Sequence, residues 1–387
     1  MYYMSIIDEK SRNIDIMDNL NKTKVLSDSA QFDLCDSQNR SRISDVNLPG
    51  IYPATGKDGC TIPLFKTLMT NKCKNDCKYC LNQCQRDFTR LELSPEEIAK
   101  VFIRYYTSGY VNGLFLSSGV SDTIDNTMER LIETCNILRK TYGYEDYIHL
   151  KIIPGASKDA IKRSMELADR VSINIEAASS DGLSQIASTK DYNKDILKRL
   201  SWINSLYKRD RTLSPSGPTT QLIVGANDES DLEILNRMEK IYKKTYLKRT
   251  YFSPFIAMED TSLESRCDCN PQRTNQLYHA DALLNDYKFK AKELVFDEEN
   301  NISLTEDPKI LAASKMDIFP LEINSANFHD LIRVPGIGLK SARRIIDIRS
   351  KKPFNNINDL KKTGVVTSRA EPYIKLKGNY QAALDSF

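Results

Sequence analysis

The sequence lacks the features of a membrane or secreted protein. No apolar run is long enough to span a bilayer, and the mean hydropathy is −0.46. The first ten residues contain no basic stretch followed by an uninterrupted apolar core, so no secretory signal is expected. Histidine is scarce, with three residues, and His149 and His329 lie within apolar patterns, so we assign them no role. We therefore expect a cytoplasmic protein that makes no membrane contact.

A strong excess of one charge is also absent. The 55 Lys and Arg residues against 52 Asp and Glu residues give a formal net charge of +3. A net charge this small predicts no partner by itself, although its distribution along the chain matters. The 387 residues are more than one hydrophobic core usually serves, so we expect one large domain and a smaller one.

What the sequence does contain is nine cysteines, an odd number, with three crowded into one short stretch. In a reducing compartment they indicate metal ligands and free thiols rather than disulfides. Cys73, Cys77 and Cys80 follow the pattern C-x3-C-x2-C, with an aromatic residue, Tyr79, just before the last cysteine. This spacing fits an iron–sulfur cluster. A cubane cluster has four irons, so three thiolates leave one iron open to a reacting ligand, which indicates chemistry rather than scaffolding.

A second interpretation of this loop is open, because Cys84 extends the pattern to C-x3-C-x2-C-x3-C. Four thiolates can close a structural iron–sulfur or zinc site. We expect Cys84 to be a bystander, since the loop follows a predicted strand and a barrel pattern comes after it. Cys267, Cys269 and His279 lack a fourth ligand and a recognised spacing, so free thiols are expected there.

Apolar, β-branched runs alternate with amphipathic helical stretches from about Leu93 to Pro254, which predicts βα units around a parallel sheet. Ser94, Pro95 and Glu97 supply an N-cap, a proline at the first helical position and a capping-box glutamate for a helix that ends near Gly109. Further helices are centred near Leu131, Ile161, Ile203 and Leu235. Six strands, which indicate a barrel or partial barrel, are predicted at Thr61–Thr67, Gly113–Ser117, Ile148–Ile153, Arg170–Ile175, Thr219–Val224 and Arg249–Ser253.

The ends of these strands are where ligand contacts are expected. In such barrels, loops at the carboxyl ends of strands carry the chemistry, and the cysteine loop leaves the first predicted strand. Small or polar residues stand at other strand ends, where a buried strand would otherwise stay apolar. The candidates are Ser117, Ser118 and Gly119 at the second strand, Asn174 and Glu176 at the fourth, and Gln221, Val224 and Gly225 at the fifth.

The C-terminal region contains a second informative segment, in which an apolar helix runs into Pro-Gly-Ile-Gly and an amphipathic helix follows. Gly336 and Gly338 allow a tight turn whose amides lie bare at the start of the second helix, where the helix dipole favours a phosphate oxygen. Between Arg333 and Lys352, seven basic residues accompany one acidic residue. The segment therefore predicts backbone–phosphate binding without reading of sequence. The alternative is a helical hairpin used only for packing or protein contact.

The cysteine loop and its position after the first strand of a βα array resemble the radical S-adenosylmethionine (radical SAM) superfamily, from about Tyr52 to Phe255. The resemblance implies a [4Fe–4S] cluster held by Cys73, Cys77 and Cys80, with S-adenosylmethionine on the fourth iron, and a 5′-deoxyadenosyl radical that abstracts hydrogen from the substrate. Ser-Ser-Gly stands where the superfamily more often has Gly-Gly-Glu. The implied cofactor contacts are Tyr79, Ser117, Ser118, Gly119, Asn174, Glu176, Gln221, Val224, Gly225, Phe252 and Ser253.

The C-terminal segment resembles the helix-hairpin-helix motif of DNA repair proteins. The implied DNA contacts are Gly336, Gly338, Lys340, Ser341, Arg343 and Arg344. The whole chain from about Leu26 resembles the DNA modification or repair radical SAM proteins, often encoded beside a uracil-DNA glycosylase-like protein. The expected organisation is an N-terminal extension (1–50), a radical SAM domain with a partial (β/α)6 TIM-like barrel (51–290), and a connector with a small all-α helix-hairpin-helix domain (291–387).

The expected function is that of a radical SAM enzyme that modifies or repairs DNA, supplied with electrons by a reducing donor. Modification of RNA such as tRNA is the alternative within enzymes, and binding to structured RNA loops would favour it. A non-catalytic iron–sulfur DNA-binding protein is the alternative from another class. It requires a fully protein-ligated cluster, which loss of Cys84 would then destroy.

Overall fold

The computed structural model describes residues 18–33, 48–55, 60–377 and 379–380, which fall into two compact units. The first unit comprises residues up to 229 together with 241–270, and the second comprises 230–240 and 271 onward. Within the described ranges, no helix combines the length and the apolar character needed to cross a membrane.

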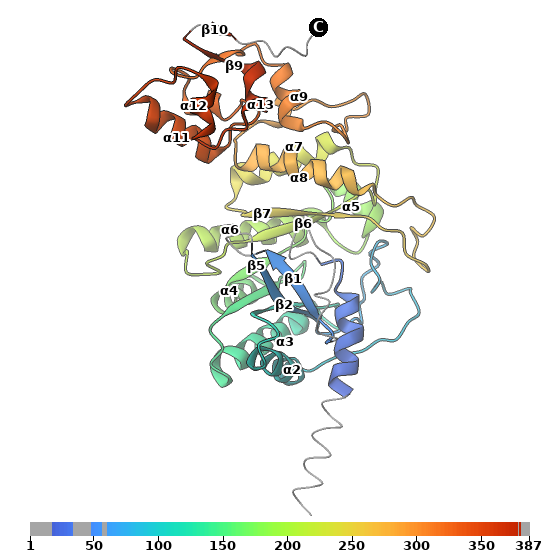
Figure 1. The fold of residues 1–387 in the computed structure, drawn as a ribbon. Helices are drawn as coiled ribbons and strands as arrows, with labels where there is room; N and C mark the ends of the chain where they lie inside the picture. The colour runs from blue at the N-terminus through green and yellow to red at the C-terminus, as the bar shows by residue number, and fades with distance from the viewer. Residues whose placement is uncertain (1–17, 34–47, 56–59, 378, 381–387) are drawn as a thin grey trace, which may run out of the picture. The chain divides into compact units, whose positions relative to one another are not determined.

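A curled seven-stranded sheet forms the centre of the first unit (Figure 1). Its strands follow one another in chain order, with β1 antiparallel to β2 and every later neighbour parallel. This half-barrel confirms the predicted fold class. The strands are β1 (Ile51–Thr55), β2 (Thr61–Leu68), β3 (Gly113–Ser117), β4 (Tyr147–Lys151), β5 (Arg170–Ser172), β6 (Thr219–Val224) and β7 (Arg249–Pro254).

Helices connect the parallel strands and pack side by side, α2 against α3, α3 against α4, and α4 against α6. The predicted capping box at Ser94 is present, with both of its hydrogen bonds. The helices in this part of the chain are α2 (Pro95–Thr107), α3 (Ile124–Asn136), α4 (Lys158–Leu167), α5 (Ser180–Ile186), α6 (Lys198–Arg209) and α7 (Asp231–Lys244), with π-helical turns at Ile137–Thr141 and Tyr192–Leu197.

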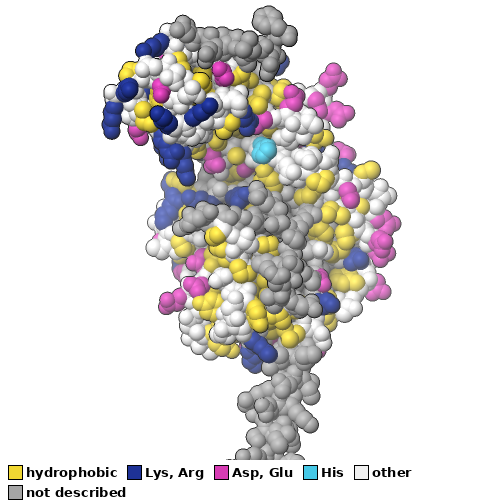
Figure 2. All heavy atoms as spheres, in the orientation of Figure 1, with side chains coloured by type: hydrophobic (Ala, Val, Ile, Leu, Met, Phe, Trp, Pro, Cys, Tyr) yellow, Lys and Arg dark blue, Asp and Glu magenta, His cyan; other side chains and the backbone are white. Residues whose placement is uncertain are grey.

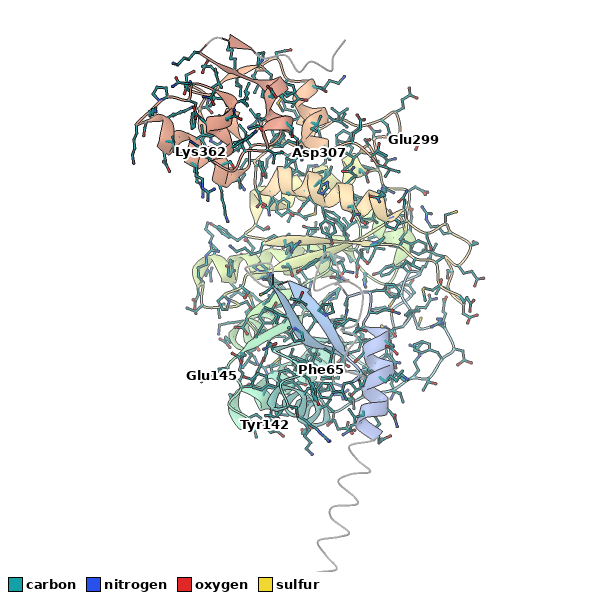
Figure 3. The ribbon with its side chains drawn as sticks, viewed as in Figure 1. Phe65, Tyr142, Glu145, Glu299, Asp307 and Lys362 are labelled. Carbon is teal, nitrogen blue, oxygen red and sulfur yellow. The ribbon has the colours of Figure 1, made fainter. Side chains whose placement is uncertain are left out.

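The two faces of the sheet carry different side chains. Phe65 on β2 is fully buried, and its ring centre lies 6.3 Å from that of Phe102 and 5.4 Å from that of Tyr105 on α2 (Figure 3). Because neighbouring residues of a strand point to opposite faces, Lys66 points to the concave side of the sheet. His149 is two strands along in the same row, in register through Phe115. The concave face is therefore partly polar.

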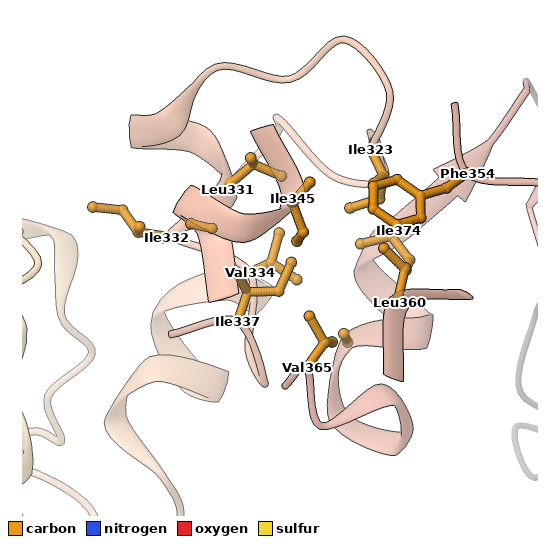
Figure 4. Close-up of a cluster of buried hydrophobic side chains, with 12 residues drawn as sticks. Ile323, Leu331, Ile332, Val334, Ile337, Ile345, Phe354, Leu360, Val365 and Ile374 are labelled. Carbon is orange, nitrogen blue, oxygen red and sulfur yellow. The ribbon is translucent and has the colours of Figure 1, made fainter. Parts of the chain in front are cut away.

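The second unit is mostly helical and has its own hydrophobic core, built around Leu331, Ile337, Ile345, Phe354 and Val365 (Figure 4). A small sheet in the order β10-β9-β8, which the sequence analysis did not predict, lies beside the helices. The elements are α8 (Pro271–Asn285), a 3₁₀ turn (Ala291–Glu293), α9 (Pro308–Ser314), β8 (Leu321–Glu322), α10 (Phe328–Leu331), α11 (Leu339–Arg349), α12 (Ile357–Lys361), α13 (Thr367–Ala370), a 3₁₀ turn (Glu371–Tyr373), β9 (Ile374–Leu376) and β10 (Asn379–Tyr380).

The predicted strands at Gly113–Ser117 and Thr219–Val224 coincide with β3 and β6. The fourth predicted strand, Arg170–Ile175, is wrong in length, because β5 ends at Ser172. The chain beyond it still bonds to β6 through the amide of Ile175 and the carbonyl of Gln221, at 3.0 Å, but Glu176 turns into the left-handed region with φ of 62°. Strand β1 was not predicted. Cys35 and much of the stretch before Asn47 lie outside the described residues.

Candidate functional site

The cysteine loop leaves the carboxyl end of β2 and is held in shape by Arg90. The Arg90 guanidinium donates hydrogen bonds to four backbone carbonyls, at 2.6–2.9 Å. Asn71, which precedes Cys73, supplies one of these carbonyls. The other three belong to residues that follow Cys80, namely Asn82, Gln83 and Arg86. A second tie comes from Asp76, which accepts hydrogen bonds from the amide and hydroxyl of Thr189, at 3.1 and 2.8 Å. These contacts give shape to a loop with little regular structure.

The loop brings Cys73, Cys77 and Cys80 to one cavity, whose lining they share. Backbone amides donate to two of the sulfurs: Val120 to Cys73 Sγ at 3.5 Å and Asn82 to Cys80 Sγ at 3.4 Å. Hydrogen bonds to cysteine sulfur are a means by which proteins tune iron–sulfur clusters. The donor set and its surroundings therefore fit such a cluster.

Among the residues that the structure describes, no three or more His, Cys, Asp or Glu side chains converge on a single ion. Thiolates around a cubane cluster stand further apart, because each binds a different iron. Cys84 is exposed and is not one of the residues that line the cavity.

The polar residues at three strand ends share the same cavity. The lining includes Ser117 at the end of β3 with Ser118 and Gly119 just beyond it, Asn174 and Glu176 after β5, and Gln221 on β6. Only glycine fits at position 119, because a Cβ atom there would lie 2.3 Å from the Lys72 carbonyl oxygen of the cysteine loop. The cavity and its open mouth enclose about 910 Å³ free of protein atoms.

Glu176 links the end of β5 to the cysteine loop. It is buried and adopts a left-handed φ of 62°, which is uncommon for a residue other than glycine and is often found at functional sites. Its carboxylate pairs with the Lys190 ammonium at 3.1 Å and accepts a hydrogen bond from Asn174 Nδ2 at 3.5 Å. The Oδ1 atom of Asn174 is buried without a hydrogen-bond partner, which leaves an acceptor for a ligand.

The charges around Cys77 act on one another. Burial raises the pKa of the Cys77 thiol, although Lys190 acts in the opposite direction. Burial also acts to lower the pKa of Lys190, but Cys77 and Glu176 outweigh it and raise that pKa. Burial, followed by Glu176 and Cys77, raises the pKa of Tyr79 well above its usual value. The buried Lys190 ammonium is therefore placed to compensate negative charge on the cysteine loop.

Four of the predicted cofactor contacts do not line the cavity: Val224, Gly225, Phe252 and Ser253. All four lie at or near the ends of β6 and β7, and Val224, Phe252 and Ser253 are buried. A Cβ atom on Gly225 would lie 2.9 Å from the Cβ atom of Cys269, so this glycine packs against the chain after β7.

The sequence analysis missed several residues of the cavity wall. Phe32 and Asp33 come from the segment before the barrel, where no motif indicated a role, and Lys190 comes from a loop. Lys151 could have been identified from the sequence, because a lysine within the apolar strand run from Ile148 to Ile153 is unusual.

In the second unit, the predicted glycine turn joins α10 to α11. Gly336 has a φ of 81°, and a Cβ atom there would lie 2.4 Å from the Val366 carbonyl oxygen. Gly338 is the N-cap of α11 and offers no side-chain cap, so the first amides of this helix stay available to an anion. The hydroxyl of Ser341, which was predicted as a DNA contact, already donates a hydrogen bond to the Gly364 carbonyl at 2.9 Å.

The turn is surrounded by basic side chains. Lys340, Arg343 and Arg344 are exposed. Figure 2 shows Lys and Arg side chains gathered over the part of the second unit that carries α11. One amine lies beneath the turn instead: Lys309 on α9 is buried and donates to the Ile337 carbonyl at 2.8 Å. Asp307, labelled in Figure 3, caps α9 by accepting from the Lys309 amide at 2.8 Å.

Comparison with known proteins assigns both regions. The radical SAM superfamily model matches residues 67–241, and the helix-hairpin-helix motif model matches residues 320–370. No curated protein sequence matches the chain.

Several solved structures are similar to parts of it. A HydG maturase of the [FeFe]-hydrogenase is 10% identical over 57% of this chain and 49% of that chain, with a TM-score of 0.45. Methylornithine synthase (PylB) is 15% identical over 58% and 62%, with a TM-score of 0.45. HydG from Carboxydothermus hydrogenoformans is 16% identical over 57% and 51%, with a TM-score of 0.41. The chain thus covers less than two thirds of each of these structures.

Radical SAM enzymes use a [4Fe–4S] cluster and S-adenosylmethionine, which the three-cysteine cavity fits. The chain therefore contains a radical SAM domain and a helix-hairpin-helix motif.

Proposed function

We propose that this protein is a radical SAM enzyme that acts on nucleic acid, in the modification or repair of DNA. One observation carries the proposal: Cys73, Cys77 and Cys80 share a cavity with the polar strand ends of the barrel, while Cys84 is exposed and outside that lining. Three ligands instead of four leave one iron for the cofactor. When bound and reduced, the cluster and S-adenosylmethionine supply a radical that abstracts hydrogen from a substrate.

The residues of the chain hold and shield this chemistry. The three thiolates bind the cluster, while Lys190 balances part of its negative charge. Ser117, Asn174 and Gln221, which line the cavity, contact the cofactor in this proposal. Tyr79, Ser118, Gly119 and Glu176 complete the wall.

The helix-hairpin-helix motif supplies the docking surface. The bare amides at the start of α11 bind a backbone phosphate, and Lys340, Arg343 and Arg344 bind neighbouring phosphates. Such contacts hold nucleic acid without reading its sequence. A base that reacts within the barrel must leave the duplex stack or come from a single strand.

Reconstitution of the cluster tests the enzyme class. Anaerobic addition of iron and sulfide is expected to give about four irons per chain, lost in Cys77→Ala and kept in the matched variant Cys84→Ala. Dithionite and S-adenosylmethionine are expected to yield 5′-deoxyadenosine. Loss of the cluster in Cys84→Ala, or a full cluster that gives no 5′-deoxyadenosine, would support the non-catalytic alternative.

Mass spectrometry of nucleosides tests the substrate class. DNA and RNA from a strain that lacks this protein are compared with those from the parent strain. A changed deoxynucleoside supports the proposal, and a change confined to RNA supports the alternative of tRNA modification. The uracil-DNA glycosylase-like partner that the resemblance implies stays a prediction, which co-purification from the native cell tests.

A further inference from the structure

Two lysines lie buried on the concave side of the sheet. Lys66 on β2 is 2% exposed and Lys151 on β4 is 7% exposed. An ammonium group removed from water is costly unless it is paired or hydrogen-bonded. Both lysines bond to residues 31–33, which precede the barrel in the sequence, and the Lys66 ammonium also lies 4.2 Å from the ring centre of Tyr52.

Side chains from three strands hold this short segment in place. Lys66 Nζ donates to the carbonyls of Gln31, at 3.3 Å, and Asp33, at 2.9 Å. Gln221 Nε2 on β6 donates to the Phe32 carbonyl at 2.9 Å. Lys151 pairs with the Asp33 carboxylate, with Nζ 2.6 Å from Oδ1. The segment is thus part of the barrel interior and not a loose extension.

The ion pair faces the cavity that holds the cysteines. Phe32, Asp33 and Lys151 line that cavity together with Cys77 and Gln221. A pair that only fastened the segment could be replaced by apolar packing at a lower desolvation cost. The backbone contacts of Lys66 and Gln221 already fasten it. The position of the pair on the cavity wall therefore indicates a ligand.

We propose that Asp33 and Lys151, with Phe32 beside them, form the subsite that recognises the reacting base. This inference rests on the proposed function and names the part of the substrate that enters the barrel. The edge of a nucleobase carries hydrogen-bond donors next to acceptors. A carboxylate beside an ammonium is the complement of that pattern, because one accepts from N–H and the other donates to a carbonyl or ring nitrogen. Bases taken out of the stack are commonly held by such edge contacts together with aromatic or apolar side chains.

Hydrogen exchange measures this recognition on the full chain with its cluster reconstituted. The probes are a mixed-sequence single-stranded oligonucleotide and an abasic oligonucleotide of equal length. The mixed-sequence strand is expected to protect the peptides that span residues 27–33 and 147–153, and the abasic strand is not. Asp33→Asn and Lys151→Met are each expected to need about tenfold more oligonucleotide for half-protection, the change expected when a charge-assisted hydrogen bond is lost.

A swap variant separates recognition from fastening. Asp33→Lys combined with Lys151→Asp restores an ion pair but exchanges donor and acceptor, so base-dependent protection is expected to stay weak. Protection equal to that of the unaltered protein would show that the pair only fastens the segment and would overturn the inference. If the swap loosens residues 27–33 in the free protein, Asp33→Glu provides the test instead. This variant keeps the carboxylate, so it is expected to bind the mixed-sequence strand more tightly than Asp33→Asn does. Equal binding by the two variants would overturn the inference.

Duplex binding distinguishes the failure of this inference from that of the proposed function. Equal protection by the abasic strand, with duplex still bound by the protein, would overturn the base subsite and leave the proposed function intact. Absence of binding to single strands and duplex alike would overturn both.

Discussion

Replacing Lys309 with methionine removes a titration that affects the stability of the second unit. The Lys309 amine lies beneath the glycine turn, 2.8 Å from the Ile337 carbonyl oxygen and 4.6 Å from the ring centre of Tyr287. Burial lowers the pKa of Lys309 from 10.5 to about 7, while Asp307 acts in the opposite direction. The amine can donate to the carbonyl in either protonation state, so what pH changes is the cost of a buried charge.

The sign follows from proton binding in the two states. Between about pH 7 and pH 10.5 the unfolded chain keeps a proton that the folded unit has released, so the free energy of unfolding rises with pH. Below the folded pKa both states are protonated, and the full cost of the buried charge is present. One pKa unit corresponds to about 1.4 kcal/mol, which gives a gain of about 2 kcal/mol between pH 7 and pH 9.

Hydrogen exchange of peptides from α10 and α11, corrected for intrinsic rates, measures the opening free energy at pH 7 and pH 9. The difference between the unaltered protein and Lys309→Met is expected to shift by about 2 kcal/mol in favour of the unaltered protein at the higher pH. Lys315→Met, at an exposed lysine just after α9, controls for loss of a charge. An identical pH dependence in all three proteins would refute the reasoning.

Three further changes test other parts of the structure. Lys340→Glu with Arg343→Glu is expected to weaken DNA binding and lower the salt slope of log Kd by about two, and an unchanged slope would indicate another nucleic-acid surface. Arg90→Lys keeps the charge, but one ammonium cannot serve four carbonyls, so the cysteine loop is expected to lose about 2–4 kcal/mol of stability, seen as faster proteolysis at the loop and lower iron retention. Gly336→Ala places a Cβ 2.4 Å from the Val366 carbonyl oxygen at a φ of 81°, so it is expected to lower the thermal midpoint of the second unit. In the control Gly338→Ala, the nearest atom to the new Cβ is 3.7 Å away, and the midpoint is expected to stay unchanged. Equal midpoints for the two variants would contradict this account.

The sequence revealed the barrel because its signals are local. Alternation of apolar strands and amphipathic helices, and the Ser94 capping box, need no distant contact to be recognised, and β3 and β6 lie where the pattern predicts them. Strand β1 was missed because Pro53 lies inside it, and a proline within an apolar run argues against a strand in the sequence pattern, although β1 pairs antiparallel with β2. The strand-end rule placed Ser117, Asn174 and Gln221 on the cavity wall.

The remaining residues of the wall could not be found this way. Asp33 acquires its place through a contact with Lys151, 118 residues further along the chain, and no pattern near Asp33 announces it. Lys190 likewise meets Glu176 only because the loop after α5 folds back over the end of β5. Phe252, predicted as a cofactor contact by position, is buried and does not line the cavity, and its contact with the cofactor stays a prediction. Side-chain direction at a strand end depends on register, which sequence spacing does not fix to one residue.

The four carbonyls gathered by Arg90 bear on how this protein acquires its metal. In zinc fingers, metal binding supplies the energy that orders the chain, so the empty protein is unfolded. Here the Arg90 guanidinium adds four backbone contacts around the cysteines to whatever the thiolate ligands contribute. Part of the order of this loop therefore comes from the protein's own side chains and does not draw on the binding energy of the cluster.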